Sequence, residues 1–390
     1  MSVARRAPHL ASRLQGLGTT VFAEMSALAE ATGSVNLGQG FPDTDGPVEV
    51  AEAAMAAIRD GRNQYPPGPG IAPLREAIAA HRQRFYGQHL DPDTEVLVTA
   101  GATEAITAAV LALCETGDEV ILIEPYYDSY PAAVALAGAR PRLVPLRPPS
   151  WELDVDALGT AVTARTRLVI VNSPHNPTGR VLTDGELAAV AAACVDHDLI
   201  AVTDEVYEHL VYDGLRHRPL AGYPGMAERT LTVSSAGKTF AFTGWKVGWA
   251  CGPAPLVAAV RTVKQFLTYV NGAPFQPAVA MGLGLADSVF CDAADALAAG
   301  RDLLCDGLAS VGFEVAARPQ AGYFAVADAA PLGGTDAAAF CRELPHRAGV
   351  VAIPVSAFCE RRDDVASLVR FAFCKRPQVL EEAVRRLGRL

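Results

Sequence analysis

Two lysines, Lys238 and Lys246, stand in the segment "SSAGKTFAFTGWKVGW". Lysine is rarely buried, because removing its charge from water costs several kcal/mol. Lys238 nevertheless follows small residues and precedes Phe240, Phe242 and Trp245. One interpretation is an exposed lysine at the end of a strand. The other is a lysine in a partly apolar pocket, whose amine can be neutral and nucleophilic.

Apolar runs that alternate with helical patterns must position these lysines. Because the runs are continuously apolar, they are typical of strands covered on both faces in a mainly parallel sheet. The sequence therefore predicts an α/β fold. The predicted strands are "EVLVTAG" (95–101), "EVILIEP" (119–125), "RLVIVNSP" (167–174), "LIAVTDEVY" (199–207) and "LTVSSAG" (231–237), with "GELAAVAAACVDHD" as one connecting helix.

Small residues follow the first predicted strand and open a helix. In an open α/β sheet, ligands bind beyond the carboxyl ends of the strands. Gly101, Ala102 and Thr103 would let backbone N–H groups and the helix dipole meet an anion such as phosphate. A plain N-cap role for Thr103 is the simpler alternative.

Other polar residues end the later strands. Asn176 lies in the rigid turn "NSPHNPTG", Asp204 and Tyr207 follow the next strand, and Lys238 follows the last. A loop, an ion pair or a helix cap could explain each one alone. Pyridoxal 5′-phosphate uses the whole set, because it carries a phosphate, a phenolic oxygen, a pyridine nitrogen and an aldehyde.

The chain length and a change of pattern predict two domains. A chain of 390 residues is long for a single core. After about residue 283 the α/β alternation ends, and "AGYFAVADA", "GVVAIPVSAF" and "LVRFAFCK" indicate an α+β unit. We expect a large cofactor-binding domain at 46–282 and a small domain made of 1–45 and 283–390.

The composition argues against several classes of protein. The formal net charge of −10 disfavours nucleic acid and anionic membranes as partners. Apolar segments are too short to cross a bilayer, and no secretory signal is recognisable. The eight cysteines lack metal-like spacing and the histidines form no HxxxH pair, so we expect no metal and a reducing cytoplasmic location.

The ordered motifs "GATEA", "EPYYDSY", "NSPHNPTG", "DEVYEHL", "SSAGKTFAFTGWKVGW" and "LVRFAF" resemble the class I/II aminotransferases of fold type I. "VNLGQGFPD", "NQYPPGPG" and "IPVSAF" extend the resemblance over nearly the whole chain, within the kynurenine, glutamine and methionine aminotransferase subgroup. "TTVFAEMSALA" and "GAPFQPAVA" are most similar to the actinobacterial enzymes assigned as N-succinyldiaminopimelate aminotransferases.

The resemblance implies catalytic roles for three residues. Lys238 would bind the cofactor aldehyde covalently and then move the substrate proton, Asp204 would keep the pyridinium protonated, and Tyr207 would bond the phenolic oxygen with Asn176. Further implied cofactor contacts are Gly101, Ala102, Thr103, Ser235 and Lys246 at the phosphate, Tyr127 on the ring face, and Tyr65 reaching the phosphate from the other subunit of a homodimer. The implied substrate contacts are Arg370 at the α-carboxylate, Asn176, Gly40 and Phe22. Many relatives place arginine where Lys246 stands, so the charge is kept but the bidentate fork is lost.

The implied activity is a ping-pong transfer of an amino group from an L-amino acid, glutamate above all, to a 2-oxo acid. N-succinyldiaminopimelate is the favoured substrate. Kynurenine, methionine and glutamine remain alternatives, as does β-elimination from cysteine conjugates at the same site. A regulator would need a DNA-binding module, and a non-catalytic binding protein would lack Lys238 or Asp204.

Overall fold

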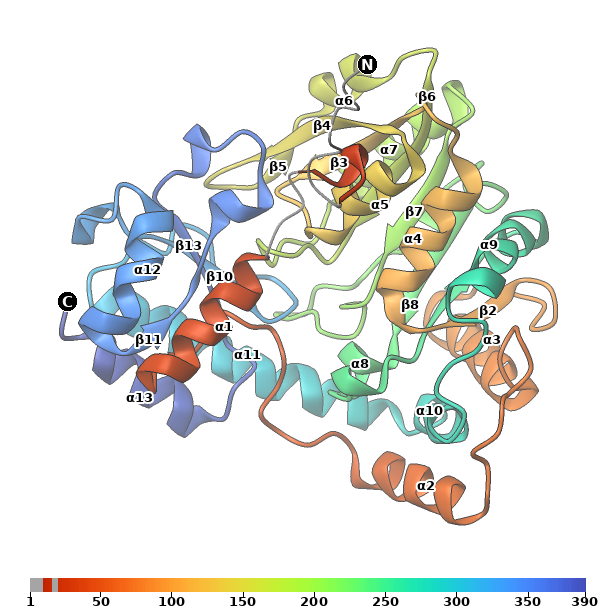
Figure 1. The fold of residues 1–390 in the computed structure, drawn as a ribbon, viewed down its shortest axis with the longest axis horizontal. Helices are drawn as coiled ribbons and strands as arrows, with labels where there is room; N and C mark the ends of the chain where they lie inside the picture. Colours follow the sequence, from red (N-terminus) through yellow and green to blue (C-terminus); the bar gives the residue numbers. More distant parts are fainter. Residues whose placement is uncertain (1–9, 16–19) are drawn as a thin grey trace, which may run out of the picture.

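An eight-stranded sheet forms the centre of the molecule (Figure 1). The computed structural model describes residues 10–15 and 20–390; residues 1–9 and 16–19 of the predicted small domain lie outside them. The strand order is β2-β9-β8-β7-β6-β3-β4-β5, and β8, β7, β6, β3 and β4 run parallel. The strands are β2 (Val96–Thr99), β3 (Glu119–Glu124), β4 (Arg140–Arg147), β5 (Glu152–Leu153), β6 (Thr166–Asn172), β7 (Ile200–Asp204), β8 (Thr230–Ser235) and β9 (Gly248–Cys251). The predicted mainly parallel α/β fold is confirmed.

Helices cover both faces of this sheet, as the continuous apolar strands predict. In β3, Val120 and Leu122 face one helical layer, whereas Ile121 and Ile123 face the other. The first layer contains α4 (Gly101–Leu113), α5 (Ser129–Ala137) and α9 (Ala254–Leu267). The second contains α3 (Ala72–Tyr86), α6 (Val155–Ala161), α7 (Asp184–Asp196) and α10 (Phe275–Leu283), and α2 (Val48–Arg59) packs on α10.

The remaining elements build a smaller α+β part around a second core. Its antiparallel sheet has the order β10-β13-β12, and β1 pairs in parallel with β11. The N-terminal α1 packs on α12, which joins the start of the chain to its end. We propose that the domains divide at residues 46 and 283. The elements are α1 (Val21–Thr32), β1 (Val35–Asn36), α11 (Asp287–Ser310), β10 (Phe324–Asp328), α12 (Ala337–Ala348), β11 (Val350–Val351), β12 (Ile353–Pro354), β13 (Leu368–Ala372) and α13 (Pro377–Leu387).

Three strands of the large sheet were not predicted. β4 reads "RPRLVPLR", in which arginine and proline interrupt the apolar run. β5 has two residues, and β9 is antiparallel to both of its neighbours. β4 and β5 lie at one edge of the sheet, and β9 is buried but has only four residues.

Two further findings concern membranes and cysteines. Within the described residues no single helix is long and apolar enough to cross a bilayer. Only the pair α10 and α11 together has the length and apolar composition of a membrane span, and the axes of these two helices are bent by 94° at the break between them. All eight cysteines are free, and only Cys291 is exposed.

Candidate active site

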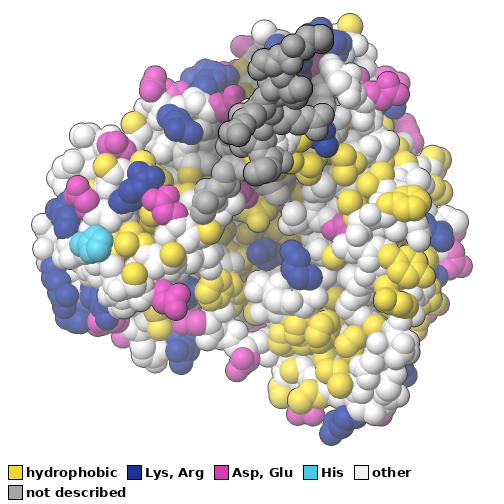
Figure 2. Space-filling view, viewed as in Figure 1, with side chains coloured by type: hydrophobic (Ala, Val, Ile, Leu, Met, Phe, Trp, Pro, Cys, Tyr) yellow, Lys and Arg dark blue, Asp and Glu magenta, His cyan; other side chains and the backbone are white. Residues whose placement is uncertain are grey.

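A cavity of about 440 Å³ opens beyond the carboxyl ends of the parallel strands, where the large sheet meets the smaller part. Figure 2 shows Lys and Arg side chains at the middle of this face, beside the hollow. All predicted site residues except Tyr65 line the cavity. They are Phe22, Gly40, Gly101, Ala102, Thr103, Tyr127, Asn176, Asp204, Tyr207, Ser235, Lys238, Lys246 and Arg370.

The start of α4 forms one end of the cavity. The helix has Ala100 as its N-cap with no side-chain cap, so Thr103 lies inside the first turn and the simple capping role considered for it is wrong. A Cβ on Gly101 would lie 3.3 Å from Nζ of Lys246, and one on Gly248 would lie 2.7 Å from the carbonyl carbon of Gly101. These glycines therefore let backbone N–H groups and an ammonium group approach the same anion.

Asp204 ends β7 at the centre of the cavity wall. Tyr130 Oη donates to its Oδ2 at 2.6 Å, and the backbone N–H of Val206 donates to its Oδ1 at 3.3 Å. Burial raises the pKa of Asp204, and these two hydrogen bonds and the charge of Lys238 oppose that rise. A protonated ring nitrogen next to this carboxylate would offset the cost of burying it.

Lys238 lies in the short helix α8 (Ala236–Thr239), directly after β8. Its Nζ is 5.5 Å from the centroid of the Tyr323 ring, and that ring meets the Tyr207 ring edge-on at 5.1 Å. A Cβ on Gly237 would lie 3.0 Å from Cα of Thr243, so the chain passes close to itself here. The half-buried amine thus lies beside the ring of Tyr323, and its nucleophilic role stays a prediction.

Arg370 lies on β13 and is 1% exposed. Nη1 donates to Oδ1 of Asn176 at 3.0 Å and Nη2 donates to the carbonyl of Gly38 at 2.8 Å. Burial lowers the pKa of Arg370 to about 10, and its buried Nε has no hydrogen-bond partner among the described residues. A buried guanidinium with unused donor capacity is suited to a carboxylate ligand.

Aromatic rings enclose this guanidinium. Its Cζ lies 3.8 Å from the ring centroid of Phe324, 4.6 Å from that of Phe358 and 5.3 Å from that of Phe22. Tyr323 Oη donates to the carbonyl of Gly40 at 2.7 Å, and a Cβ on Gly40 would overlap the Phe324 ring. Gly40 therefore permits the aromatic packing that surrounds Arg370.

Asn172 fixes the turn that carries Asn176. Its Nδ2 donates to the carbonyls of Asp204 at 2.9 Å and Pro174 at 3.0 Å, and its Oδ1 accepts from the N–H of Asn176 at 2.8 Å. One buried amide thus ties the ends of β6 and β7 together. The prolines predicted a rigid turn, and the three hydrogen bonds of Asn172 also hold this turn in place.

Two predicted aromatic residues occupy different environments. Tyr127 lines the cavity, with its ring 6.5 Å from that of Phe22 and 5.9 Å from that of Tyr130. Tyr65 is 82% exposed and contacts the ring of Tyr269 at 5.7 Å, outside the cavity. Within one chain, the structure therefore does not bring Tyr65 to the site.

Several cavity residues were missed. Tyr130 belongs to the quoted "EPYYDSY", and its place in that motif was the signal that could have found it. Of the aromatic residues around Arg370, only Phe22 was predicted, although Phe324 lies in the quoted "AGYFAVADA" and Phe358 in "IPVSAF". The missed residues that line the cavity or support it include Gln39, Asp128, Tyr130, Asn172, Phe324 and Phe358.

The described residues fit pyridoxal 5′-phosphate. An anion cradle faces Lys246, a buried carboxylate faces the same cavity, and a partly buried lysine lies over the ring of Tyr323. The sequence model of the family described as aminotransferase class I and II matches residues 32–387. The chain belongs to this family. It is therefore a pyridoxal phosphate-dependent aminotransferase of fold type I, acting on amino acids and 2-oxo acids.

Known aminotransferases resemble this one over nearly their full length. The chain is 58% identical over 387 residues to a Mycobacterium tuberculosis protein described as "probable N-succinyldiaminopimelate aminotransferase", covering 97% of each. It is 41% identical to a methionine aminotransferase of Escherichia coli, covering 97% of this chain and 98% of that one. The solved structure of the M. tuberculosis N-succinyldiaminopimelate aminotransferase superimposes with a TM-score of 0.95 at 59% identity, covering 97% of this chain and 99% of that chain.

Proposed function

We propose that this aminotransferase transfers the amino group of glutamate to the 2-oxo acid that corresponds to N-succinyldiaminopimelate. The observation that carries the proposal is the 58% identity over 387 residues to the M. tuberculosis relative of that name. The cavity residues support aminotransferase chemistry, because Arg370, Asp204 and Lys246 carry charges that suit the α-carboxylate, the ring nitrogen and the phosphate, and Lys238 suits the aldehyde. We also propose a cytoplasmic location, which the free and mostly buried cysteines support.

The roles of the residues follow from their surroundings. Bound pyridoxal phosphate supplies an electron sink for the charge that develops at the substrate α-carbon. Arg370 binds the α-carboxylate through its free donor capacity, and Asn176 holds the guanidinium in place. Nζ of Lys238 takes the α-proton and returns it, while the carboxylate of Asp204 holds the proton on the ring nitrogen.

The active unit in this proposal is a homodimer with shared sites. Tyr65 is exposed and does not line the cavity of its own chain, so it is available to reach the phosphate site of a partner. Figure 2 shows hydrophobic side chains gathered over the region of α2 and α10. A second copy would cover exposed apolar residues of α2 and α9, which include Val48, Met55, Ile58, Phe266 and Leu267.

Subunit complementation tests the shared site. Lys238→Ala and Tyr65→Ala proteins should each be nearly inactive, and a mixture of the two after subunit exchange should regain activity through one intact site per hybrid. Light scattering would report the mass of each sample. A fully active monomer, or a Tyr65→Ala protein as active as the wild type, would refute this arrangement.

The substrate assignment is tested by comparing kcat/KM for different amino acids. N-succinyldiaminopimelate should exceed kynurenine and methionine by more than about tenfold, a difference of about 1.4 kcal/mol. The opposite order would favour an aromatic or thioether substrate, for which the rings of Phe22 and Phe324 are suited. Pyruvate release from a cysteine conjugate, without added 2-oxo acid, would instead reveal β-elimination.

A further inference from the structure

A buried group of two histidines and a glutamate lies behind the cofactor cavity. His81 comes from α3, and Glu208 and His209 come from the turn that follows β7. Nε2 of His81 is 2.7 Å from Nε2 of His209, and one potential ligand atom from each of the three residues lies within 4.8 Å of the others. None of the three residues lines the cavity, and the proposed reaction uses none of them.

The three side chains offer two imidazole rings and one carboxyl group within reach of one another. Nδ1 of His81 is buried and has no hydrogen-bond partner among the described residues.

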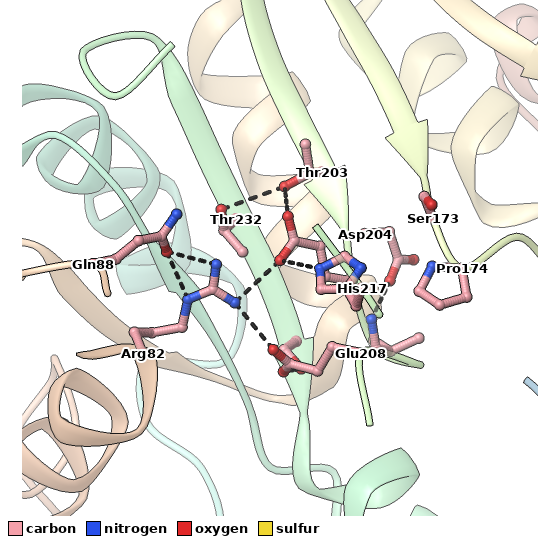
Figure 3. A network of polar contacts seen from close by, with 12 residues as sticks. Arg82, Gln88, Ser173, Pro174, Thr203, Asp204, Glu208, His217 and Thr232 are labelled. Atoms are coloured by element: carbon pink, nitrogen blue, oxygen red, sulfur yellow. Dashed lines mark hydrogen bonds and ion pairs between the residues drawn. The ribbon is translucent and has the colours of Figure 1, made fainter. Parts of the chain in front are cut away.

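One cation is shared by two carboxylates next to this group. Nη1 of Arg82 lies 3.0 Å from a carboxylate oxygen of Glu205 and 3.0 Å from one of Glu208, so one guanidinium serves two buried carboxylates (Figure 3). His217 lies 3.0 Å from Glu205 and forms no such contact with Glu208 among the described residues. Glu208 thus shares its ion-pair partner with Glu205, which favours a further cation beside it.

The spacing suits a small ion with nitrogen and oxygen ligands. Two imidazole nitrogens at zinc bond lengths and a tetrahedral angle are roughly 3.3 Å apart, so a slight rotation of the two rings would admit the ion. Glu208 Oε1 accepts from Ser234 at 2.5 Å and Oε2 accepts from Arg82, yet each carboxylate oxygen has a second lone pair. The ring centroids of Phe85 and Phe290 lie 4.7 and 4.4 Å from that of His209, which is half-buried.

We propose that His81, Glu208 and His209 form a binding site for one divalent d-block ion such as zinc. With two nitrogen ligands and one carboxylate, the site favours zinc over magnesium or calcium. The bound ion ties α3 to the turn that carries Tyr207 and follows Asp204. It stabilises the folded enzyme, because the unfolded chain does not bring the three ligands together.

Zinc titration of the chelator-treated holoenzyme tests this site. The wild type should bind one equivalent of zinc per chain by elemental analysis, and its melting temperature should rise with zinc but not with magnesium. His81→Gln and His209→Gln should weaken zinc binding by more than about tenfold and remove the rise. His197→Gln, at an exposed histidine, is the matched control and should behave as the wild type.

A second readout separates the site from general stabilisation. Cobalt in place of zinc should give a visible absorption band of a tetrahedral site in the wild type and in His197→Gln, but not in His81→Gln. If the wild type binds no zinc, or if all three variants bind it equally, the proposal is wrong. The 2.7 Å contact would then be a hydrogen bond between two neutral histidines.

Discussion

Tyr130 Oη lies 2.6 Å from Oδ2 of Asp204, which joins α5 to the end of β7 inside the cavity wall. This hydrogen bond favours the ionised carboxylate in a place where burial favours the neutral one. The contact therefore decides over which pH range Asp204 can hold a proton on the cofactor ring.

Replacing Tyr130 by Phe should move the acid limb of the kcat/KM profile to higher pH. A hydrogen bond to a charged group contributes about 1.5–3 kcal/mol, which corresponds to roughly one to two pH units. Because the bond lowers the pKa of Asp204, its loss raises that pKa, and activity is lost earlier as the pH falls. Tyr126→Phe is the control, since this neighbouring buried tyrosine forms no contact with Asp204. An unchanged profile in Tyr130→Phe would refute the role.

Asp204→Asn should lower kcat by orders of magnitude while much of the cofactor stays bound. The amide cannot keep the ring nitrogen protonated, but the phosphate contacts of α4 and Lys246 remain. Stopped-flow measurement of the amino-acid half-reaction reports the chemical step directly. A near-normal rate would show that the carboxylate does not act on the ring.

Gly40→Ala should raise KM for donor and acceptor alike. The new methyl group overlaps the Phe324 ring, which packs on the guanidinium of Arg370. Overpacking costs typically 1–3 kcal/mol, so a rise of about tenfold is expected. Gly185→Ala, where a Cβ meets nothing within 4 Å, should leave the steady-state kinetics unchanged. Equal KM values in the two variants would contradict the packing argument.

Arg82→Met should destabilise the fold by about 3–5 kcal/mol at pH 7, because two buried carboxylates lose their partner. The pKa of Glu208 is lowered to about 2, so the stabilisation is present at neutral pH and is lost as the pH falls toward that value. Urea unfolding should thus show a gap between Arg82→Met and wild type that is complete at pH 7 and narrows only below about pH 4.5, toward pH 2. Arg84→Met, which removes a more exposed pair with Asp287, should cost under about 1 kcal/mol.

The sequence predicted the centre of the sheet and the residues that end its strands. Asn176, Asp204 and Lys238 could be predicted because a parallel sheet brings the ends of its strands to one edge. Residues that depend on helix orientation could not be derived in this way. Tyr130 reaches Asp204 because α5 packs back over the sheet. The hydrophobic periodicity of the sequence does not encode how a helix is oriented on the sheet.

The surroundings of Arg370 were harder still to predict. Phe22, which the resemblance implied as a substrate contact, reaches the guanidinium from the N-terminal segment, whereas Phe324 and Phe358 reach it from segments that follow the large domain in the sequence. Phe324 and Phe358 alone are ordinary core aromatic residues. Their common target exists only after the N-terminal segment packs on the smaller part of the molecule.

Borohydride reduction of the holoenzyme, followed by peptide mapping, tests the central claim most directly. Reduction fixes the cofactor to the lysine that holds its aldehyde. The account predicts the label on Lys238 alone, with none in Lys238→Ala protein and with Lys246 unlabelled, because Lys246 faces the anion cradle at Gly101. Label on Lys246, or on any lysine outside the cavity, would contradict the assignment of the site.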